Sequence, residues 1–501
     1  MTEGPPTRVL LVYPQLPDTF WSYKYALKFI SKKASSPPLG LLTVAAMLPP
    51  EWETRLVDTQ VTPLGDGEIE WADYVFISAM SIQEKSVRQV VARCRAKGVK
   101  TVGGGPLFTA MADAFPDVDY LVLDEAEITL PLFLKDLEQG RLKHVYTSGE
   151  RADIGLTPIP RWDLIDMKKY ASMNLQYSRG CPFDCDFCNI TVLFGQKPRT
   201  KGKDQIVAEL ERLYCTGWRG SVFFVDDNFI GNRAKLKKDV LPAIVGWMAE
   251  KRYPFEFATE VSINLADDRP LMEQMVKAGF DTVFVGIETP DENSLAECRK
   301  VQNENRDLMD SVKTIQRSGL QVQAGFILGF DNDPPSIFDR MARFIQDSGI
   351  VTAMVGLLNA PRGTRLHKRL GIEGRLLSEI SGDHMESINF IPKMNLDVLI
   401  HGYHRILRTI YSPHCYYDRV RRFLSEYAPG RNRIVRFKAN YLTAFLRSVF
   451  FLGIVGRERI DYWKLLLWSL FTRPRLVPLA IQLAICGFHF RKVSADRFTR
   501  R

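Results

Sequence analysis

The sequence predicts an α/β protein with two successive strand–helix series and a helical C-terminal region. Short, nearly all-apolar runs alternate with longer amphipathic segments over residues 8–145 and again over residues 173–357. After about residue 365 the strand signal stops. Such alternation is typical of parallel sheets covered by helices. With 501 residues, 46% of them apolar and 25% charged, the chain is long enough for about two to four domains that need no disulfides.

The first series predicts a doubly wound, Rossmann-like domain over residues 1–148. Its first strand, residues 8–13, is almost entirely apolar and ends at Pro14, as expected of a buried parallel strand. Further strands are expected at residues 54–57, 74–78, 100–103 and 120–123, with helices at residues 37–47 and 84–97. The proline-rich stretch that follows predicts a linker over residues 149–172.

The second series predicts a partial, TIM-like (β/α)6 barrel over residues 173–365. Its first strand begins near Met173, and the later strands are expected at residues 221–225, 256–260, 282–287, 322–328 and 353–357. Helices at residues 203–216 and 270–278 lie between them. In such barrels the loops after the strands carry the chemistry. A helical domain is expected over residues 366–435 and a basic amphipathic tail over residues 436–501.

Three cysteines lie in the loop after the first barrel strand, as Cys181-x3-Cys185-x2-Cys188, with Phe187 before the last. Clustered thiolates select iron–sulfur clusters or zinc. Structural zinc usually takes four protein ligands, and the sequence has no second cysteine pair. The pattern therefore favours a four-iron cluster with three protein ligands. Its open iron can chelate the amino and carboxylate groups of a small molecule.

With this motif and the barrel around it, the chain resembles the radical S-adenosylmethionine superfamily. The resemblance implies a [4Fe–4S] cluster on Cys181, Cys185 and Cys188, which are then also the catalytic residues, and S-adenosylmethionine as the ligand of the open iron. The residues that would contact S-adenosylmethionine are Phe187, Asp226, Asp227, Glu260, Glu288, Gly325 and Gly329. Each carboxylate has an alternative interpretation as a solvated or salt-bridged strand end, and Asp226 and Asp227 are also candidates for contacting the substrate.

The glycines in Gly103-Gly104-Gly105-Pro106 end a strand of the first domain. Glycines there allow the backbone to approach a large flat ligand, although an ordinary tight turn would look the same. Together with Pro37–Leu41, residues 78–81 and residues 124–127, the segment resembles the cobalamin-binding domains fused to radical enzymes. Phe20–Tyr25 and residues 225–232 place the resemblance close to the hopanoid C-2 methylase branch.

The resemblance implies cobalamin contacts at Ser78, Ser81, Gly103, Gly104, Gly105 and Glu127. Many cobalamin domains supply a lower histidine ligand, but residues 1–143 contain no histidine. The sequence leaves two alternatives: the domain binds cobalamin without a histidine ligand, or it binds no cobalamin.

These features imply a cobalamin-dependent C-methyltransferase that uses a 5′-deoxyadenosyl radical and methylcobalamin. The expected substrate is a hydrophobic polycyclic molecule, either a hopanoid-type lipid or a tetrapyrrole side chain. The alternatives are a radical cyclase or rearrangement enzyme acting on a lipid or secondary metabolite, and a cobalamin or iron–sulfur sensor. A flavodoxin or ferredoxin is expected as electron donor, and no nucleic acid as partner.

The formal net charge is +9, and residues 436–501 alone hold 13 Lys/Arg and three Asp/Glu. Cations interleaved with aromatic and aliphatic residues predict a helix lying in a bilayer interface, or else an amphipathic helix packed on the barrel. No apolar run reaches the roughly 20 residues that span a bilayer. The scattered remaining cysteines favour the reducing cytoplasm, with the tail at the inner face of the membrane.

Overall fold

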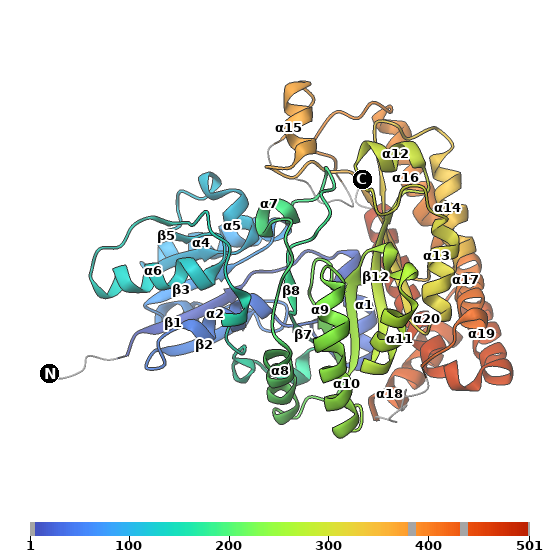
Figure 1. The fold of residues 1–501 in the computed structure, drawn as a ribbon, viewed down its shortest axis with the longest axis horizontal. Helices are drawn as coiled ribbons and strands as arrows, with labels where there is room; N and C mark the ends of the chain where they lie inside the picture. Colours follow the sequence, from blue (N-terminus) through green and yellow to red (C-terminus); the bar gives the residue numbers. More distant parts are fainter. Residues whose placement is uncertain (1–5, 379–386, 431–438, 499–501) are drawn as a thin grey trace.

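The computed structural model describes residues 6–378, 387–430 and 439–498, and the predicted fold class is confirmed. Figure 1 shows two α/β bodies side by side, with helices of the C-terminal region on the far side of the second one. The predicted domain boundaries stay predictions, and the one between residues 435 and 436 lies outside the described residues.

The N-terminal sheet is six-stranded and parallel, in the order β2-β1-β3-β4-β5-β6. Its strands are β1 (Arg8–Tyr13), β2 (Glu53–Asp58), β3 (Tyr74–Ser78), β4 (Lys100–Gly104), β5 (Tyr120–Val122) and β6 (Val145–Tyr146). One face is covered by α2 (Leu39–Met47) and α6 (Ala126–Glu138), and the other by α3 (Asp66–Trp71), α4 (Glu84–Ala96) and α5 (Pro106–Ala110). In this doubly wound order, ligands bind beyond the carboxyl ends of the strands where the order reverses.

The second sheet is also six-stranded and parallel, in the order β14-β13-β12-β11-β10-β7. Its strands are β7 (Ser172–Leu175), β10 (Ser221–Phe224), β11 (Glu256–Val261), β12 (Phe280–Glu288), β13 (Gln321–Leu328) and β14 (Ala353–Leu357). The outer face is covered by α8 (Lys203–Cys215), α10 (Leu241–Glu250), α11 (Arg269–Ala278), α13 (Leu308–Arg317) and α14 (Ile337–Ser348). β7 and β14 are edge strands, so the barrel is open on one side.

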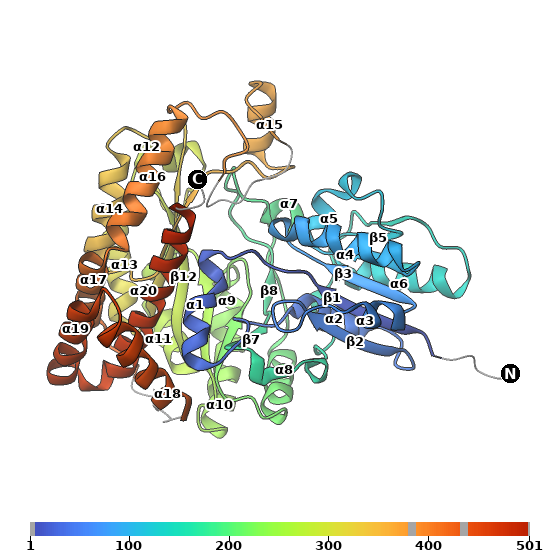
Figure 2. The same cartoon turned by 180° about the vertical axis from the view of Figure 1, so that it is seen from behind.

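Segments from both ends of the chain cover the open side of the barrel (Figure 2). After β1, residues Phe20–Ser22 and α1 (Lys24–Leu27) cross from the first body to the barrel. At the barrel, Phe20 stacks on Phe490 of α20 (Val477–Phe498) at 4.1 Å between ring centroids. The Nε2–H of the buried His489 donates a hydrogen bond to the Phe20 carbonyl oxygen at 2.9 Å. Trp21 meets Phe284 of β12 edge-on at 5.3 Å between centroids. Residues from both termini therefore complete the barrel wall.

The rest of the C-terminal region is helical, as predicted. Its other helices are α15 (Arg365–Ile372), α16 (Leu396–Ile410), α17 (Pro413–Glu426), α18 (Ala439–Ser448), which continues as a π-helical turn over Val449–Ile454, and α19 (Arg459–Thr472). The expectation that no segment is long enough to span a bilayer needs correction. Pro474–Ala495 forms 22 continuous helical residues that are long and apolar enough by length and composition. However, 56% of its apolar window is buried inside the protein, which marks α20 as a core helix.

A glycine on α20 tests this assignment. A Cβ on Gly487 would overlap the ring of Tyr416, which is fully buried and donates a hydrogen bond to the Leu483 carbonyl at 2.7 Å. We expect Gly487→Ala to lower the free energy of unfolding by about 1–3 kcal/mol through overpacking. The matched control is Gly246→Ala on α10, where nothing lies within 4 Å and alanine should stabilise the helix by about 0.5–1 kcal/mol. Equal effects of both changes in urea unfolding would show that α20 is not packed as described.

Candidate functional site

The three cysteines of the motif lie in the loop between β8 (Ser178–Arg179) and α7 (Ile190–Phe194). β8 pairs with β9 (Arg199–Thr200) in a short antiparallel hairpin at the end of β7. Gly180 turns the chain into the loop with a φ of 90°, and a Cβ there would lie 2.8 Å from the Gly195 carbonyl oxygen. Only glycine fits this turn, and it directs Cys181 toward the barrel.

All three thiols are free, and they share one electrostatic environment. Burial raises the pKa of each, to about 12 for Cys188, and the neighbouring thiols add to the rise in Cys181 and Cys188. Two side-chain amides point at sulfur, Asn228 at Cys181 and Gln302 at Cys185, each at 3.8 Å. In the described ranges no three His, Cys, Asp or Glu side chains converge on one metal ion. A four-iron cluster does not need such convergence, because each thiolate binds a different iron.

Asp226 and Asp227 follow β10 and hold the start of the cysteine loop. Asp226 accepts hydrogen bonds from the backbone N–H groups of Tyr177 and Ser178 and from the Ser178 hydroxyl at 2.5 Å. Asp227 accepts one from the Gly180 N–H at 2.9 Å. Both carboxylates therefore fix the position of the residues that precede Cys181. Their predicted contact with S-adenosylmethionine stays a prediction, and the observed bonds are those of positioning residues.

Glu260 is the second-last residue of β11 and faces the barrel interior beside these two aspartates. Burial raises the pKa of Glu260 to about 8, and the charges of Asp227 and Asp226 add to the rise. Burial likewise raises the pKa of Asp226 to about 7 and that of Asp227 to about 6. Among the described residues no side chain is seen to bond the Glu260 carboxyl. It is therefore free to contact a ligand in the barrel.

Glu288 ends β12 with a φ of 63° and forms a buried ion pair with Lys300 at 2.6 Å. A Cβ on Gly286 would lie 2.7 Å from Lys300 Nζ, so the glycine makes room for this pair. Burial acts to lower the pKa of Lys300, but Glu288 and the thiolates of Cys185 and Cys188 raise it above its usual range. Lys300 also lies 6.0 Å from the ring centroid of Phe187. It was not predicted from the sequence, because it follows an ordinary helix and no motif marks it.

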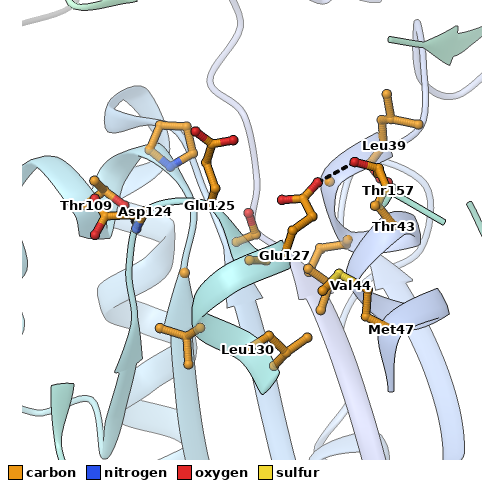
Figure 3. A pocket seen from close by; sticks show the side chains of 18 of the residues that line it. Leu39, Thr43, Val44, Met47, Thr109, Asp124, Glu125, Glu127, Leu130 and Thr157 are labelled. Atoms are coloured by element: carbon orange, nitrogen blue, oxygen red, sulfur yellow. Dashed lines mark hydrogen bonds between the residues drawn. The ribbon is translucent and has the colours of Figure 1, made fainter. Parts of the chain in front are cut away.

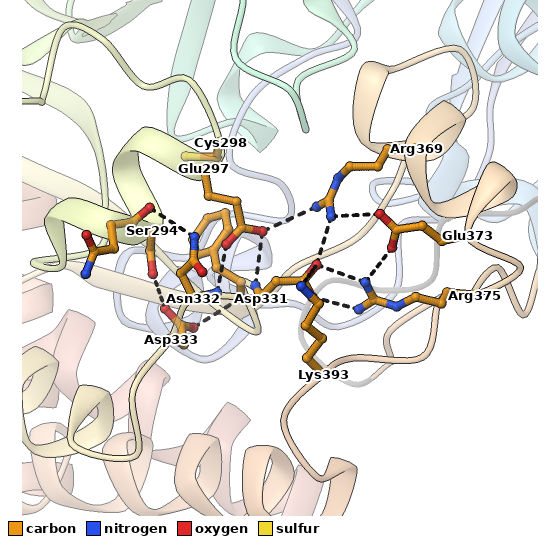
Figure 4. A network of polar contacts seen from close by, with 12 residues as sticks. Ser294, Glu297, Cys298, Asp331, Asn332, Asp333, Arg369, Glu373, Arg375 and Lys393 are labelled. Carbon is orange, nitrogen blue, oxygen red and sulfur yellow. Dashed lines mark hydrogen bonds and ion pairs between the residues drawn. The ribbon is translucent and has the colours of Figure 1, made fainter.

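The loop after β13 brings the remaining predicted contacts to the same side. Gly325 lies in β13, where a Cβ would be 3.1 Å from the Phe284 ring. The Gly329 N–H donates to Asp333 at 2.8 Å, and Phe330 meets Phe187 edge-on at 6.2 Å between centroids. Figure 4 shows how the next residues are held: Asp331 pairs with Arg369 at 2.8 Å and Arg375 at 2.7 Å. This network connects the loop after β13 to α15 and to the residues that follow α15.

The second part of the site is a cavity of about 270 Å³ between the two bodies. It lies beyond the carboxyl ends of β3, β4 and β5 and is walled by apolar residues of α2 and α6 (Figure 3). Four predicted cobalamin contacts line it, namely Ser78, Gly104, Gly105 and Glu127. Ser81 and Gly103 do not line it, and a Cβ on Gly103 would instead meet the Phe108 ring at 2.9 Å.

The glycines leave bare backbone at the end of β4. A Cβ would lie 2.9 Å from the Val122 carbonyl oxygen at Gly104 and 2.5 Å from the Ser78 hydroxyl at Gly105, whose φ is 86°. A large flat ligand can approach such a surface closely. The residues present therefore fit the close approach of a large flat group, and Ser78, Gly104, Gly105 and Glu127 would face cobalamin there.

A buried ion network joins the cavity to the cysteine loop. Arg179, two residues before Cys181, binds Glu127 at 2.8 Å and Glu125 at 3.0 Å, and Arg199 binds Glu125 at 2.6 Å. Burial acts to raise the pKa of Glu127, but Arg179 and the Thr157 hydroxyl lower it to about 2. The sequence showed Arg179 beside the motif but not its partners, which lie more than 50 positions away.

Three family profiles match the chain: the radical SAM superfamily over residues 175–345, the B12 binding domain over residues 30–134, and a domain of unknown function, DUF4070, over residues 364–500. An uncharacterised methyltransferase of Synechocystis sp. is 45% identical over 84% of this chain and 80% of its own. The hopanoid C-2 methylase of Rhodopseudomonas palustris is 34% identical over 91% of this chain and 88% of its own.

Solved structures show the same fold. The radical S-adenosylmethionine methyltransferase TsrM from Kitasatospora setae, with cobalamin and a [4Fe–4S] cluster bound, superposes with a TM-score of 0.64 at 15% identity. The match covers 98% of this chain and 99% of that one. The two-body arrangement with a helical C-terminal region is therefore shared along the whole length.

The buried network gives a first prediction for the site. Removing Arg179 leaves Glu127 buried without its cation and Glu125 with Arg199 alone, so Arg179→Ala should lower the free energy of unfolding by about 3–5 kcal/mol. Urea unfolding followed by tryptophan fluorescence measures this. The control is Arg161→Ala, whose pair with Asp163 is 41% and 49% exposed and should matter by less than about 1 kcal/mol. If Glu127→Gln does not reduce the cost of Arg179→Ala, the two residues are not coupled.

Glu260 gives a second prediction, through pH. Its folded pKa of about 8 lies above the ordinary value of 4.5, so the folded state loses stability as the pH rises through this interval. Glu260→Gln removes that loss. The variant should be more stable than the unchanged protein by roughly 1–3 kcal/mol at pH 9 and nearly equal to it at about pH 5.

Urea midpoints of the cofactor-free protein at the two pH values provide the measurement, with the exposed Glu138→Gln as control. A pH-independent effect of Glu260→Gln would mean that the carboxyl is not desolvated in the folded protein.

Proposed function

Because the chain belongs to the cobalamin-binding radical S-adenosylmethionine enzymes, we propose that it methylates an unactivated carbon of a hydrophobic polycyclic substrate, either a hopanoid-type lipid or a tetrapyrrole side chain. The observation that carries the proposal is the shared wall between its two cofactor regions. Arg179 lines the cavity of the first sheet and lies two residues before Cys181 of the barrel loop. A substrate in the barrel can therefore reach both regions.

The cofactors are a [4Fe–4S] cluster, S-adenosylmethionine and cobalamin. Cys181, Cys185 and Cys188 would hold the cluster, and Ser78, Gly104, Gly105 and Glu127 would face cobalamin. When bound, the first two cofactors supply a 5′-deoxyadenosyl radical that removes hydrogen from an unreactive carbon, and cobalamin supplies the methyl group. The protein contributes position and the exclusion of water.

The charges in the barrel support the S-adenosylmethionine assignment. Asp226, Asp227 and Glu260 crowd one side, and burial raises the pKa of each, although Arg179 and Arg199 act to lower that of Asp227 and Lys300 that of Glu260. The nearby Lys300 is held by Glu288. A ligand with a positive sulfonium and an amino group would add cationic charge beside these carboxylates and favour their ionised forms. Glu260, whose carboxyl accepts no hydrogen bond from the described residues, is the residue best placed to receive it.

The hydrophobic substrate class is supported by an aromatic wall next to these charges, where Phe284 of β12 is in register with Glu260 of β11. Trp21 lies against Phe284 from the open side of the barrel, and Gly325 leaves the Phe284 ring uncovered by a neighbouring side chain. An aromatic wall of this kind suits an apolar ring system better than a charged metabolite. The relative named as a hopanoid methylase supports the same class.

The proposal includes the surroundings of the enzyme. We assign it to the cytoplasm, where a flavodoxin or ferredoxin supplies the electrons, with its C-terminal helices in peripheral contact with the inner face of the membrane. Radical formation requires one electron per cleavage, and these small proteins are donors of suitable chemistry.

The test uses anaerobically reconstituted protein with reductant, cobalamin and S-adenosylmethionine labelled at its methyl group. We expect 5′-deoxyadenosine and a labelled methyl on cobalamin, and a substrate heavier by one labelled methyl when hopanoids and tetrapyrroles are screened by mass spectrometry. Cys185→Ala should abolish 5′-deoxyadenosine, whereas Cys215→Ala, an exposed cysteine on α8, should not affect it.

The other outcomes separate the alternatives. Deoxyadenosine together with an isomerised product that gains no methyl would indicate a cyclase or rearrangement enzyme. Cobalamin and a cluster in the protein, without either product, would indicate a sensor and contradict the proposal.

A further inference from the structure

We propose that α18 and α19 form a docking hairpin that lies in the interface of a bilayer containing anionic lipids. The hairpin comprises Leu442–Ile454 and Arg459–Thr472 and lies within the domain of unknown function. The inference rests on the proposed membrane contact and names its surface and its lipid chemistry, but it does not depend on methyl transfer.

Apolar side chains gather on this hairpin far more than elsewhere. Of the 25 large hydrophobic side chains exposed in the described residues, 11 fall within residues 442–471, so the exposure is not random. They repeat at helical spacing and form one stripe on each helix: Leu442, Leu446, Phe450, Phe451, Ile454 and Val455 on the first, and Ile460, Trp463, Leu467, Leu470 and Phe471 on the second. Stripes of this width normally face a core or a bilayer.

The opposite faces of the hairpin are fixed to the protein. Leu452, Tyr462 and Leu465 are buried. The two helices are joined by the Ser448 and Tyr462 hydroxyls at 2.8 Å and by the Trp463 indole N–H, which donates to the Gly453 carbonyl at 3.0 Å. The exposed stripes therefore belong to a rigid surface and are not the result of loosely held helices.

Charge favours a lipid surface over a protein partner. Arg457, Arg459, Lys464 and Arg475 are exposed around the stripes. The acidic Glu458 is buried and neutralised by Arg491 at 2.7 Å. An apolar stripe flanked by cations matches the boundary between acyl chains and anionic headgroups. By contrast, α20 has the length of a membrane span but lies in the core.

The hairpin adjoins the segment that reaches the barrel interior. Arg447 donates to the carbonyl oxygens of Lys28 at 2.6 Å and Phe29 at 3.2 Å, and Phe29 meets Phe451 at 5.7 Å between centroids. The same segment begins with Trp21, which contacts Phe284 inside the barrel. A bilayer under the hairpin is thus close to the wall that we assign to the hydrophobic substrate.

The test is flotation of the full-length holoprotein with two kinds of vesicle, phosphatidylcholine alone and phosphatidylcholine with phosphatidylglycerol. The variant Ile454→Glu/Phe471→Glu places charges at side chains that are 58% and 81% exposed. It should float with the mixed vesicles at least about tenfold less than the unchanged protein. Its melting temperature should change little, because both side chains are mostly exposed.

The matched control is Leu156→Glu/Ile372→Glu, at side chains that are 79% and 90% exposed. Ile372 ends α15, which both views place at the opposite end of the molecule from α18 (Figures 1 and 2). This control should float like the unchanged protein. Arg457→Ala/Lys464→Ala should weaken flotation with the mixed vesicles and leave any binding to phosphatidylcholine alone unaltered.

Three results would overturn the proposal: no flotation of the unchanged protein, equal flotation of the hairpin variant, or a dimer that the hairpin variant converts to a monomer without vesicle binding. The last would make the hairpin an interface between two copies of this chain. Production of 5′-deoxyadenosine in detergent reports the proposed chemistry separately. Flotation without that product would contradict the methyltransferase and leave the docking surface in place.

Discussion

The arrangement of the whole protein depends on one buried contact, that of Arg179 with Glu125 and Glu127. These charges are almost fully removed from water, so they are tolerable only while they remain paired. The pairing fixes the end of β5 and the start of α6 against the β8–β9 hairpin. Because Arg179 also precedes Cys181, the same contact sets where the cysteine loop begins. The position of the cysteine loop relative to the cavity of the first sheet therefore depends on this contact.

The second constraint is the incomplete barrel. Six parallel strands leave two open edges, and the chain covers the gap with Phe20–Ser22, α1 and α20. The gap is thus closed by residues from the beginning and the end of the sequence, which meet at the stacked rings of Phe20 and Phe490. The aromatic side chains give the closed side of the barrel an apolar wall. This wall is one of the observations that support the proposed hydrophobic substrate.

Local pattern was sufficient to predict the layers but not the long-range pairs. The strands at residues 8–13, 74–78 and 353–357 coincide with the observed ones, because buried parallel strands are continuous apolar runs. β6 and the β8–β9 hairpin were missed, since each strand is only two residues long. Lys300 and the partners of Arg179 were missed for a different reason. Ion pairs between distant residues leave no periodic signal, and only the folded chain brings them together.

The charge distribution inside the barrel restricts what can bind between the cysteines and the carboxylates. Lys300 approaches the thiols from the side of Glu288 and Phe187, and its charge is already compensated. On the other side Asp226, Asp227 and Glu260 have raised pKa values, because burial disfavours their charged forms and the charges of Arg179, Arg199 and Lys300 offset this only in part. A neutral or anionic ligand would leave this imbalance in place, whereas a cationic one would let the carboxylates ionise. This charge distribution supports the proposed binding of S-adenosylmethionine, whose sulfonium is positive.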